Sequence, residues 1–234
     1  MTAIIKRELY SYFCSPVAYV VLAIFLFFSG LFFSIICLSN DTSNLTYVFT
    51  NMFLVAVLLT PIMCMKLFSD EKRLRTDQAL LTSPTSILGI VMGKFLSACV
   101  LYLVCLAIYV IFGFVLSFFV DPNWPVIFCN FFGLFILGAA LISIDMFLSS
   151  LTESQMIAAV TGFAVGLLIY LLDNVSSAIP IDFLAKAVKS ISFLSHYQNY
   201  TVGLFSIADL IFFLSVIALF VFLTIRVIEK KRWS

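Results

Sequence analysis

The residues best suited to chemistry in this sequence do not combine into a catalytic motif. Gly89, Gly93 and Lys94 resemble part of a phosphate-binding loop. That loop needs one more spacer residue and a Ser or Thr after its lysine, whereas Phe95 follows here. His196 is the only histidine, and it lacks a Cys, Asp or Glu at the spacing of metal ligands. The sequence therefore predicts a non-catalytic chain that binds no metal ion and no cofactor of its own.

The overall composition is that of an integral membrane protein. Of the 234 residues, 63% are hydrophobic and 11% are charged, and the mean hydropathy is +1.18. Apolar runs recur at the length of about 20 residues with which a helix crosses a bilayer. They are continuous rather than alternating, which favours helices over a membrane barrel. The net charge of +1 gives no field to attract nucleic acid, and the six cysteines are expected to be small apolar side chains within helices.

The apolar runs predict an all-α membrane fold with six transmembrane helices in a single domain, residues 1–234. The first run is too long for the core of a cleavable signal peptide. An even number of spans places both termini on the same side of the membrane. The approximate ranges of the spans are 17–38, 47–68, 89–120, 125–150, 154–174 and 207–228.

Basic residues are strongly biased toward the side that holds the termini. Eleven of the thirteen lysines and arginines lie in the N-terminal segment, in the loop 66–95 or at the C-terminus, and only Lys186 and Lys189 lie on the other side. Basic residues accumulate in cytoplasmic loops. We therefore expect both termini and the loop 66–95 in the cytoplasm, with the chain in the inner or plasma membrane.

Two segments outside the spans are predicted to lie along the membrane. Residues 1–15 favour an amphipathic helix that ends before Pro16, and a frayed N-terminus is the alternative. Residues 175–206 are too apolar for a plain loop and are broken by Pro180, so this outer segment either lies on the membrane surface or re-enters the membrane. In the N-terminal helix the apolar side comprises Ile4, Ile5, Leu9, Tyr12 and Phe13, and the charged side comprises Lys6, Arg7 and Glu8.

Three features within the spans have two interpretations each. Asp145 is an acid inside an apolar run, which is typical of a coupling site, but it has no basic partner in the neighbouring spans, so helix packing is the alternative. Pro61 in the second span is either a hinge or a fixed bend. Ala158, Gly162 and Gly166 recur every four residues, which favours close helix packing inside the chain over contact with a second chain.

The loop 66–95 holds the densest cluster of charge. Seven of its first twelve residues are charged. Thr76 is placed to cap a short helix that ends before Pro84. That helix would expose Leu80 and Leu81 to water unless a partner covered them. An apolar tip on a charged stem is typical of a segment that docks into a groove of another protein, and the alternative is a solvated basic loop.

Four stretches of the sequence resemble the type-2 ABC exporter permeases, in particular the short permeases of gliding-motility exporters. In the central stretch, residues 69–86, an acidic and basic cluster leads to the pattern Thr76-x-x-x-Leu80-Leu81-x-x-Pro84, which is followed by Gly93-Lys94. The other stretches are residues 6–16, 147–155 and 219–233. Two residues depart from the family pattern, because many relatives have glycine at the position of Arg75 and a small or apolar residue at that of Asp145.

The resemblance implies a mechanism of transport. Two permease chains, identical or homologous, would pair in the bilayer, each with an ABC ATP-binding subunit that carries the ATP and Mg²⁺. Residues 70–84 would dock on that subunit as a coupling helix, and residues 1–15 would brace it as an interface helix through charge pairs with Glu71 and Arg73. Residues 175–206 would form outer re-entrant helices. The implied coupling residues are Asp70, Glu71, Arg73, Arg75, Thr76, Gln78, Leu80, Leu81 and Pro84, and those of the interface helix are Lys6, Arg7 and Glu8.

The predicted function is therefore that of a membrane permease subunit of an ATP-driven exporter, which is not itself an enzyme. One alternative is a membrane scaffold or assembly factor that docks an ATPase without transporting anything. A third hypothesis is a secondary transporter, but this predicts paired intramembrane charges and internal repeats, and the sequence has neither.

Overall fold

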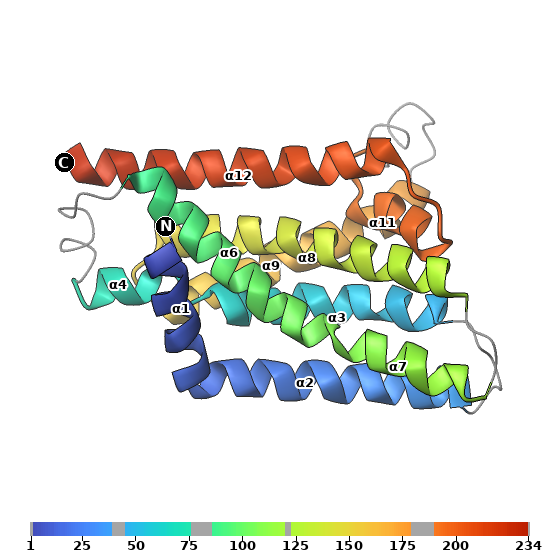
Figure 1. Cartoon of the computed structure of the whole chain (residues 1–234). Helices are drawn as coiled ribbons and strands as arrows, with labels where there is room; N and C mark the ends of the chain where they lie inside the picture. The colour runs from blue at the N-terminus through green and yellow to red at the C-terminus, as the bar shows by residue number, and fades with distance from the viewer. Residues whose placement is uncertain (1, 39–44, 76–85, 120–122, 179–189, 234) are drawn as a thin grey trace.

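The computed structural model shows long apolar helices packed side by side in a bundle (Figure 1). The structure describes residues 2–38, 45–75, 86–119, 123–178 and 190–233. Among these residues there is no β-strand, and six helical segments are long and apolar enough to cross a membrane. The predicted all-α membrane fold with six spans is confirmed. The spans are Pro16–Cys37, Thr46–Arg73, Ile87–Ser117, Trp124–Leu151, Gln155–Leu172 and Ile207–Lys230.

Local sequence signals account for several helix ends. The side chain of Ser15 accepts a hydrogen bond from the amide of Val17, and Pro16 occupies the first position of α2. Ser86 caps α6 in the same way through the amide of Gly89. The long helices are α2 (Pro16–Phe33) with the π-helical turn η1 (Ser34–Leu38), α3 (Thr46–Cys64), α6 (Ile87–Leu106) with α7 (Ile108–Ser117), α8 (Trp124–Leu151), α9 (Gln155–Ala178) and α12 (Ile207–Trp233). The short helices are α1 (Thr2–Cys14), α4 (Ser69–Arg73) and α11 (Phe193–Thr201).

The helix α8 lies at the centre of the bundle. It packs against α3, α6, α9, α11 and α12. In its most apolar stretch 72% of the residues are buried, against 22% in the corresponding stretch of α12. The outer faces of α2, α9 and α12 instead expose large apolar side chains such as Phe27, Leu168 and Phe222. These exposed faces suit contact with lipid. The helix α8, in contrast, is mostly buried and contacts the helices around it, so it sets their positions.

The predicted stripe of small residues packs within the chain, where α9 meets α3. A Cβ atom added to Gly162 would lie 2.8 Å from Pro61 Cβ and 2.8 Å from Asp145 Oδ1. One added to Gly166 would lie 2.8 Å from Val57 Cγ1 and 3.3 Å from the Val57 carbonyl oxygen. Proline at position 61 has no N–H to donate to that carbonyl. The interpretation of the stripe as intramolecular packing is thus confirmed.

Both termini, α1 and α4 lie at one end of the bundle, and α11 lies at the other (Figure 1). The helix α1 crosses its end of the bundle and packs against α2 and α6. Tyr12 on its apolar side is buried and donates a hydrogen bond to the Met63 carbonyl oxygen at 3.0 Å. Glu8, which was expected on the exposed charged side, is also buried. The middle of α1 therefore carries an acid into the bundle, and its partner is a buried base.

Candidate functional site

Lys94 lies near the start of α6, and the ammonium group of its side chain is buried. Its side chain is 1% exposed. Its Nζ atom lies 3.2 Å from Glu8 Oε1 and 2.9 Å from Glu71 Oε1, and it donates a hydrogen bond to the Leu67 carbonyl oxygen at 2.6 Å. The ring of Phe68 lies 5.1 Å from the same nitrogen. A buried charge is tolerated only when it is paired and hydrogen-bonded, so these contacts determine how α1, α4 and α6 meet.

Arg7 extends this cluster to the surface. Its Nη2 atom lies 2.6 Å from Glu8 Oε1 and 2.8 Å from Glu71 Oε1. Partial burial opposes the charge of Arg7, but hydrogen bonds and attraction from Glu8 and Glu71 outweigh it and raise the pKa of the guanidinium. Two bases and two acids from three helices thus share one site. We call Arg7, Glu8, Glu71 and Lys94 the ionic junction.

The other side of α4 is bonded to the ends of α8 and α9 at the turn between them. These hydrogen bonds join α4 to α8 and α9, in addition to the helices α1 and α6 of the ionic junction. A movement of α4 would therefore affect all four of these helices. The amides of Phe68 and Ser69 each donate to Ser149 Oγ at 3.3 Å, Lys72 Nζ donates to the Ser150 carbonyl oxygen, and Gln155 Nε2 donates to Asp70 Oδ1.

A comparison with protein families places this arrangement in context. The family model described as ABC-2 type transporter matches residues 1–207, which include the whole ionic junction. The chain belongs to the ABC-2 type transporter family. A comparison with curated proteins gave no match. The match confirms the resemblance to type-2 ABC permeases and covers three of the four sequence stretches, since residues 219–233 lie beyond it. Membership of the ABC-2 type transporter family makes the chain the membrane component of a transporter.

In this ABC-2 type transporter the structure brings together only some of the predicted site residues. Arg7, Glu8 and Glu71 meet in the ionic junction, whereas Lys6 is exposed. Arg73 pairs with Asp70 on its own helix at 3.2 Å, so the expected charge pair between Arg73 and the N-terminal helix is wrong. The other predicted coupling residues lie outside the described part of the chain, namely Thr76, Gln78, Leu80, Leu81 and Pro84.

Sequence reasoning missed the central position of Lys94. In the sequence, Lys94 resembles part of a phosphate-binding loop and matches the family pattern Gly93-Lys94. A better signal was available, because a lysine inside an apolar run is costly in a membrane and is usually paired with an acid. Gln155 and Ser149 gave no such signal, since polar residues are common at the turns between membrane spans.

Arg75 ends the described part of the loop with a left-handed backbone, at φ = 55°. This conformation costs an L-residue roughly 1–2 kcal/mol because Cβ crowds the following carbonyl oxygen, whereas glycine adopts it freely. A glycine, which the family resemblance implies at this position, would suit the backbone found here.

Replacing Arg75 by glycine is expected to raise the free energy of unfolding by up to about 1 kcal/mol, because relief of the left-handed strain exceeds the added flexibility of the unfolded chain. The midpoint of thermal unfolding in detergent measures the change. Leu74→Gly is the matched control, since Leu74 is exposed and has an ordinary φ of −85°. This control should lower stability, and equal shifts for the two variants would contradict the prediction.

Proposed function

We propose that this chain is the permease subunit of an ATP-driven exporter and couples ATP hydrolysis by a separate subunit to substrate translocation. The observation that carries the proposal is the ionic junction, which joins α1 and α4 to the start of α6 at the end of the bundle that holds both termini. Family membership supports an ABC ATP-binding subunit as the partner. The bias of basic residues supports a cytoplasmic position for this end. A second permease chain would complete the transporter.

The ionic junction gives the coupling a physical basis. The carboxylates of Glu8 and Glu71, from two helices, meet one ammonium that is 1% exposed. Separating α1 or α4 from α6 would leave a buried charge with fewer partners, which is costly. A force applied to residues 70–84 would therefore move α4, α6 and the ends of α8 and α9 together. ATP would drive transport because the ATP-binding subunit binds two conformations of the permease with different affinity.

Replacing Leu80 and Leu81 together by aspartate is expected to release the ATP-binding subunit while the permease stays in the membrane. The reason is that two charges would enter an apolar docking contact, at a loss of binding of about tenfold or more. The expectation rests on the sequence pattern. Mild detergent extraction from native membranes, followed by identification and quantification of the copurifying subunits, measures it.

Leu74→Asp is the matched control for this experiment. Leu74 is exposed and lies within residues 70–84, but it stands outside the pattern from Thr76 to Pro84 that carries the two leucines. The control should retain the ATP-binding subunit. Unchanged retention by the double variant would remove residues 70–84 from the coupling role. If the subunit copurifies but hydrolyses ATP at the same rate with and without the permease, a scaffold that docks an ATPase becomes the better description.

A further inference from the structure

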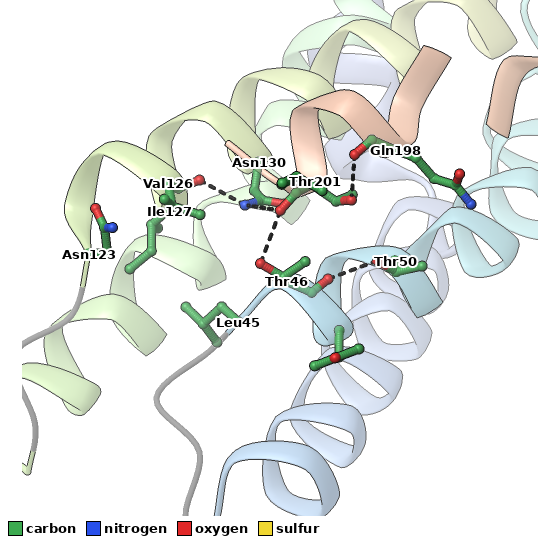
Figure 2. Close-up of a pocket in the computed structure, with 11 residues that line it drawn as sticks. Leu45, Thr46, Thr50, Asn123, Val126, Ile127, Asn130, Gln198 and Thr201 are labelled. Atoms are coloured by element: carbon green, nitrogen blue, oxygen red, sulfur yellow. Dashed lines mark hydrogen bonds between the residues drawn. The ribbon is translucent and has the colours of Figure 1, made fainter. Parts of the chain in front are cut away.

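A polar cavity of about 730 Å³ lies at the end of the bundle opposite the termini. It is partly open and is lined by the starts of α3 and α8 and by the end of α11 (Figure 2). Sites for small molecules generally have volumes of about 300–1,000 Å³. The cavity shares no residue with the ionic junction, so it is a separate feature of the fold. Its polar lining includes Thr46, Thr50, Asn123, Asn130, Gln198 and Thr201.

Asn130 indicates that this cavity binds a ligand. The residue is 1% exposed, and its side chain points from α8 toward Thr46 and Thr201 (Figure 2). Its Nδ2 atom donates hydrogen bonds to the carbonyl oxygens of Val126, at 2.8 Å, and Thr201, at 3.3 Å. Its Oδ1 atom is buried without a hydrogen-bond partner. A buried acceptor in this state costs about 1–3 kcal/mol, and a hydroxyl group bound in the cavity would remove that cost once a rotation of the Asn130 amide brings Oδ1 to the cavity surface.

The cavity offers donors and acceptors close together. On the donor side, the side-chain amides of Asn123 and Gln198 line the cavity (Figure 2). On the acceptor side, the Thr201 carbonyl oxygen at the end of α11 receives a hydrogen bond from Thr46 Oγ1 at 3.0 Å as well as that from Asn130. Hydroxyl groups suit this mixture because each one both donates and accepts.

The charge of the lining restricts the ligand further. Among the residues that the structure describes around this cavity there is no Asp, Glu, Lys or Arg. A charged ligand would therefore lose part of its hydration without meeting an opposite charge among these residues. We infer that the cavity binds an uncharged polyhydroxyl group of the kind found in a sugar ring. This inference goes beyond the proposed function, because it concerns binding by the permease chain alone.

A neighbouring cavity is relevant to whether the sugar ring belongs to a free saccharide or to a lipid. Thr50 and Gln198 also line a second space of about 500 Å³. Its remaining lining is mostly apolar and comes from α2, α3, α9 and α11. A sugar ring in the polar cavity could therefore belong to a free saccharide or to the headgroup of a lipid whose chains lie in the apolar space. The experiment has to separate these two sources.

Native mass spectrometry of the full chain tests the inference, in a detergent without a sugar headgroup so that detergent does not compete. Three lipids are added separately, namely monoglucosyl diacylglycerol, diacylglycerol and phosphatidylglycerol. We expect the chain to retain the glucosyl lipid about tenfold better than either of the others, because only this lipid offers uncharged hydroxyl groups on a ring. Saturation-transfer NMR with methyl glucoside tests the free saccharide, and binding there would show that the ring alone is sufficient.

Thr50→Val and Gln198→Ala are expected to reduce retention of the glucosyl lipid about fivefold or more, as each removes a hydrogen-bonding group from the cavity. Thr161→Val is the matched control. Thr50 and Thr161 each donate to a carbonyl oxygen four residues earlier in their own helix, at 2.9 and 2.7 Å, but Thr161 lies in α9 and does not line the cavity. Asn130 is less suitable for substitution, because its amide also holds α11 against α8.

Four results would overturn the inference, of which three concern the relative retention of lipids. These three are equal retention of diacylglycerol, tighter retention of phosphatidylglycerol, and the same retention by Thr50→Val and Gln198→Ala as by the wild type. Absence of binding for both the glucosyl lipid and methyl glucoside would overturn it too. No ATP-binding subunit is present in these measurements, so each of these failures leaves the proposed coupling function unaffected.

Discussion

Replacing Lys94 by methionine is expected to lower the free energy of unfolding by about 3–5 kcal/mol, the usual cost of removing one partner from a buried ion pair. Methionine is unbranched and fills much of the same space, so the loss arises mainly from the charge. The side chains of Glu8 and Glu71 are only 12% and 17% exposed. Without Lys94 they would share Arg7 as their basic partner in the ionic junction.

Unfolding of this variant can be followed through the cysteines of the chain. Cys64, Cys99 and Cys105 are buried, so a dye that fluoresces on reaction with thiols reports their exposure as the temperature rises. Cys14 is exposed and is replaced by serine in every variant. Adding Glu8→Gln and Glu71→Gln to Lys94→Met is expected to recover most of the lost stability, because no buried charge is then left unpaired.

Arg226→Met provides the control for this series. Arg226 and Glu229 form an exposed ion pair at 3.0 Å, and breaking such a pair changes stability by about 0–1 kcal/mol. A loss for Lys94→Met no greater than that of Arg226→Met would contradict the importance of the ionic junction. A triple variant as unstable as the single variant would attribute the loss to packing instead of charge.

The sequence predicted the spans well because a bilayer imposes their length and hydropathy. The fourth span, expected at 125–150, is found at Trp124–Leu151, where an apolar run follows Pro122 in the sequence. The helix over residues 1–15 was also expected, and α1 is found at Thr2–Cys14. In both cases the decisive forces act between residues close in sequence, so periodicity and turn residues suffice.

The ionic junction depends on contacts that no local pattern contains. Glu8 and Lys94 are 86 positions apart and meet only because α1 crosses the bundle beside α6. The helical pattern of residues 1–15 placed Glu8 with the exposed charges, since periodicity separates polar from apolar side chains without regard to a buried base elsewhere. The cavity around Asn130 was missed for the same reason, because its polar groups come from three separate helices.

The contact between α8 and α6 leaves no room for a side chain at Gly138. A Cβ atom added there would lie within 2.8 Å of three ring atoms of Tyr102. That ring is 1% exposed, and its hydroxyl group donates to the Leu134 carbonyl oxygen at 3.3 Å, so it has no free space to enter. Gly138→Ala is therefore expected to lower the free energy of unfolding by about 1–3 kcal/mol through overpacking, although alanine is the better helix former.

Gly30→Ala is the matched control for Gly138→Ala in the same thiol-exposure assay. Nothing lies within 4 Å of a Cβ atom added to Gly30 in α2, so this variant should gain up to about 1 kcal/mol from helix propensity alone. The two alanine variants are thus expected to shift the unfolding midpoint in opposite directions. Tyr102→Leu added to Gly138→Ala should restore part of the stability by making room for the methyl group. A double variant that loses the sum of the two single losses would show that the damage does not arise at this contact.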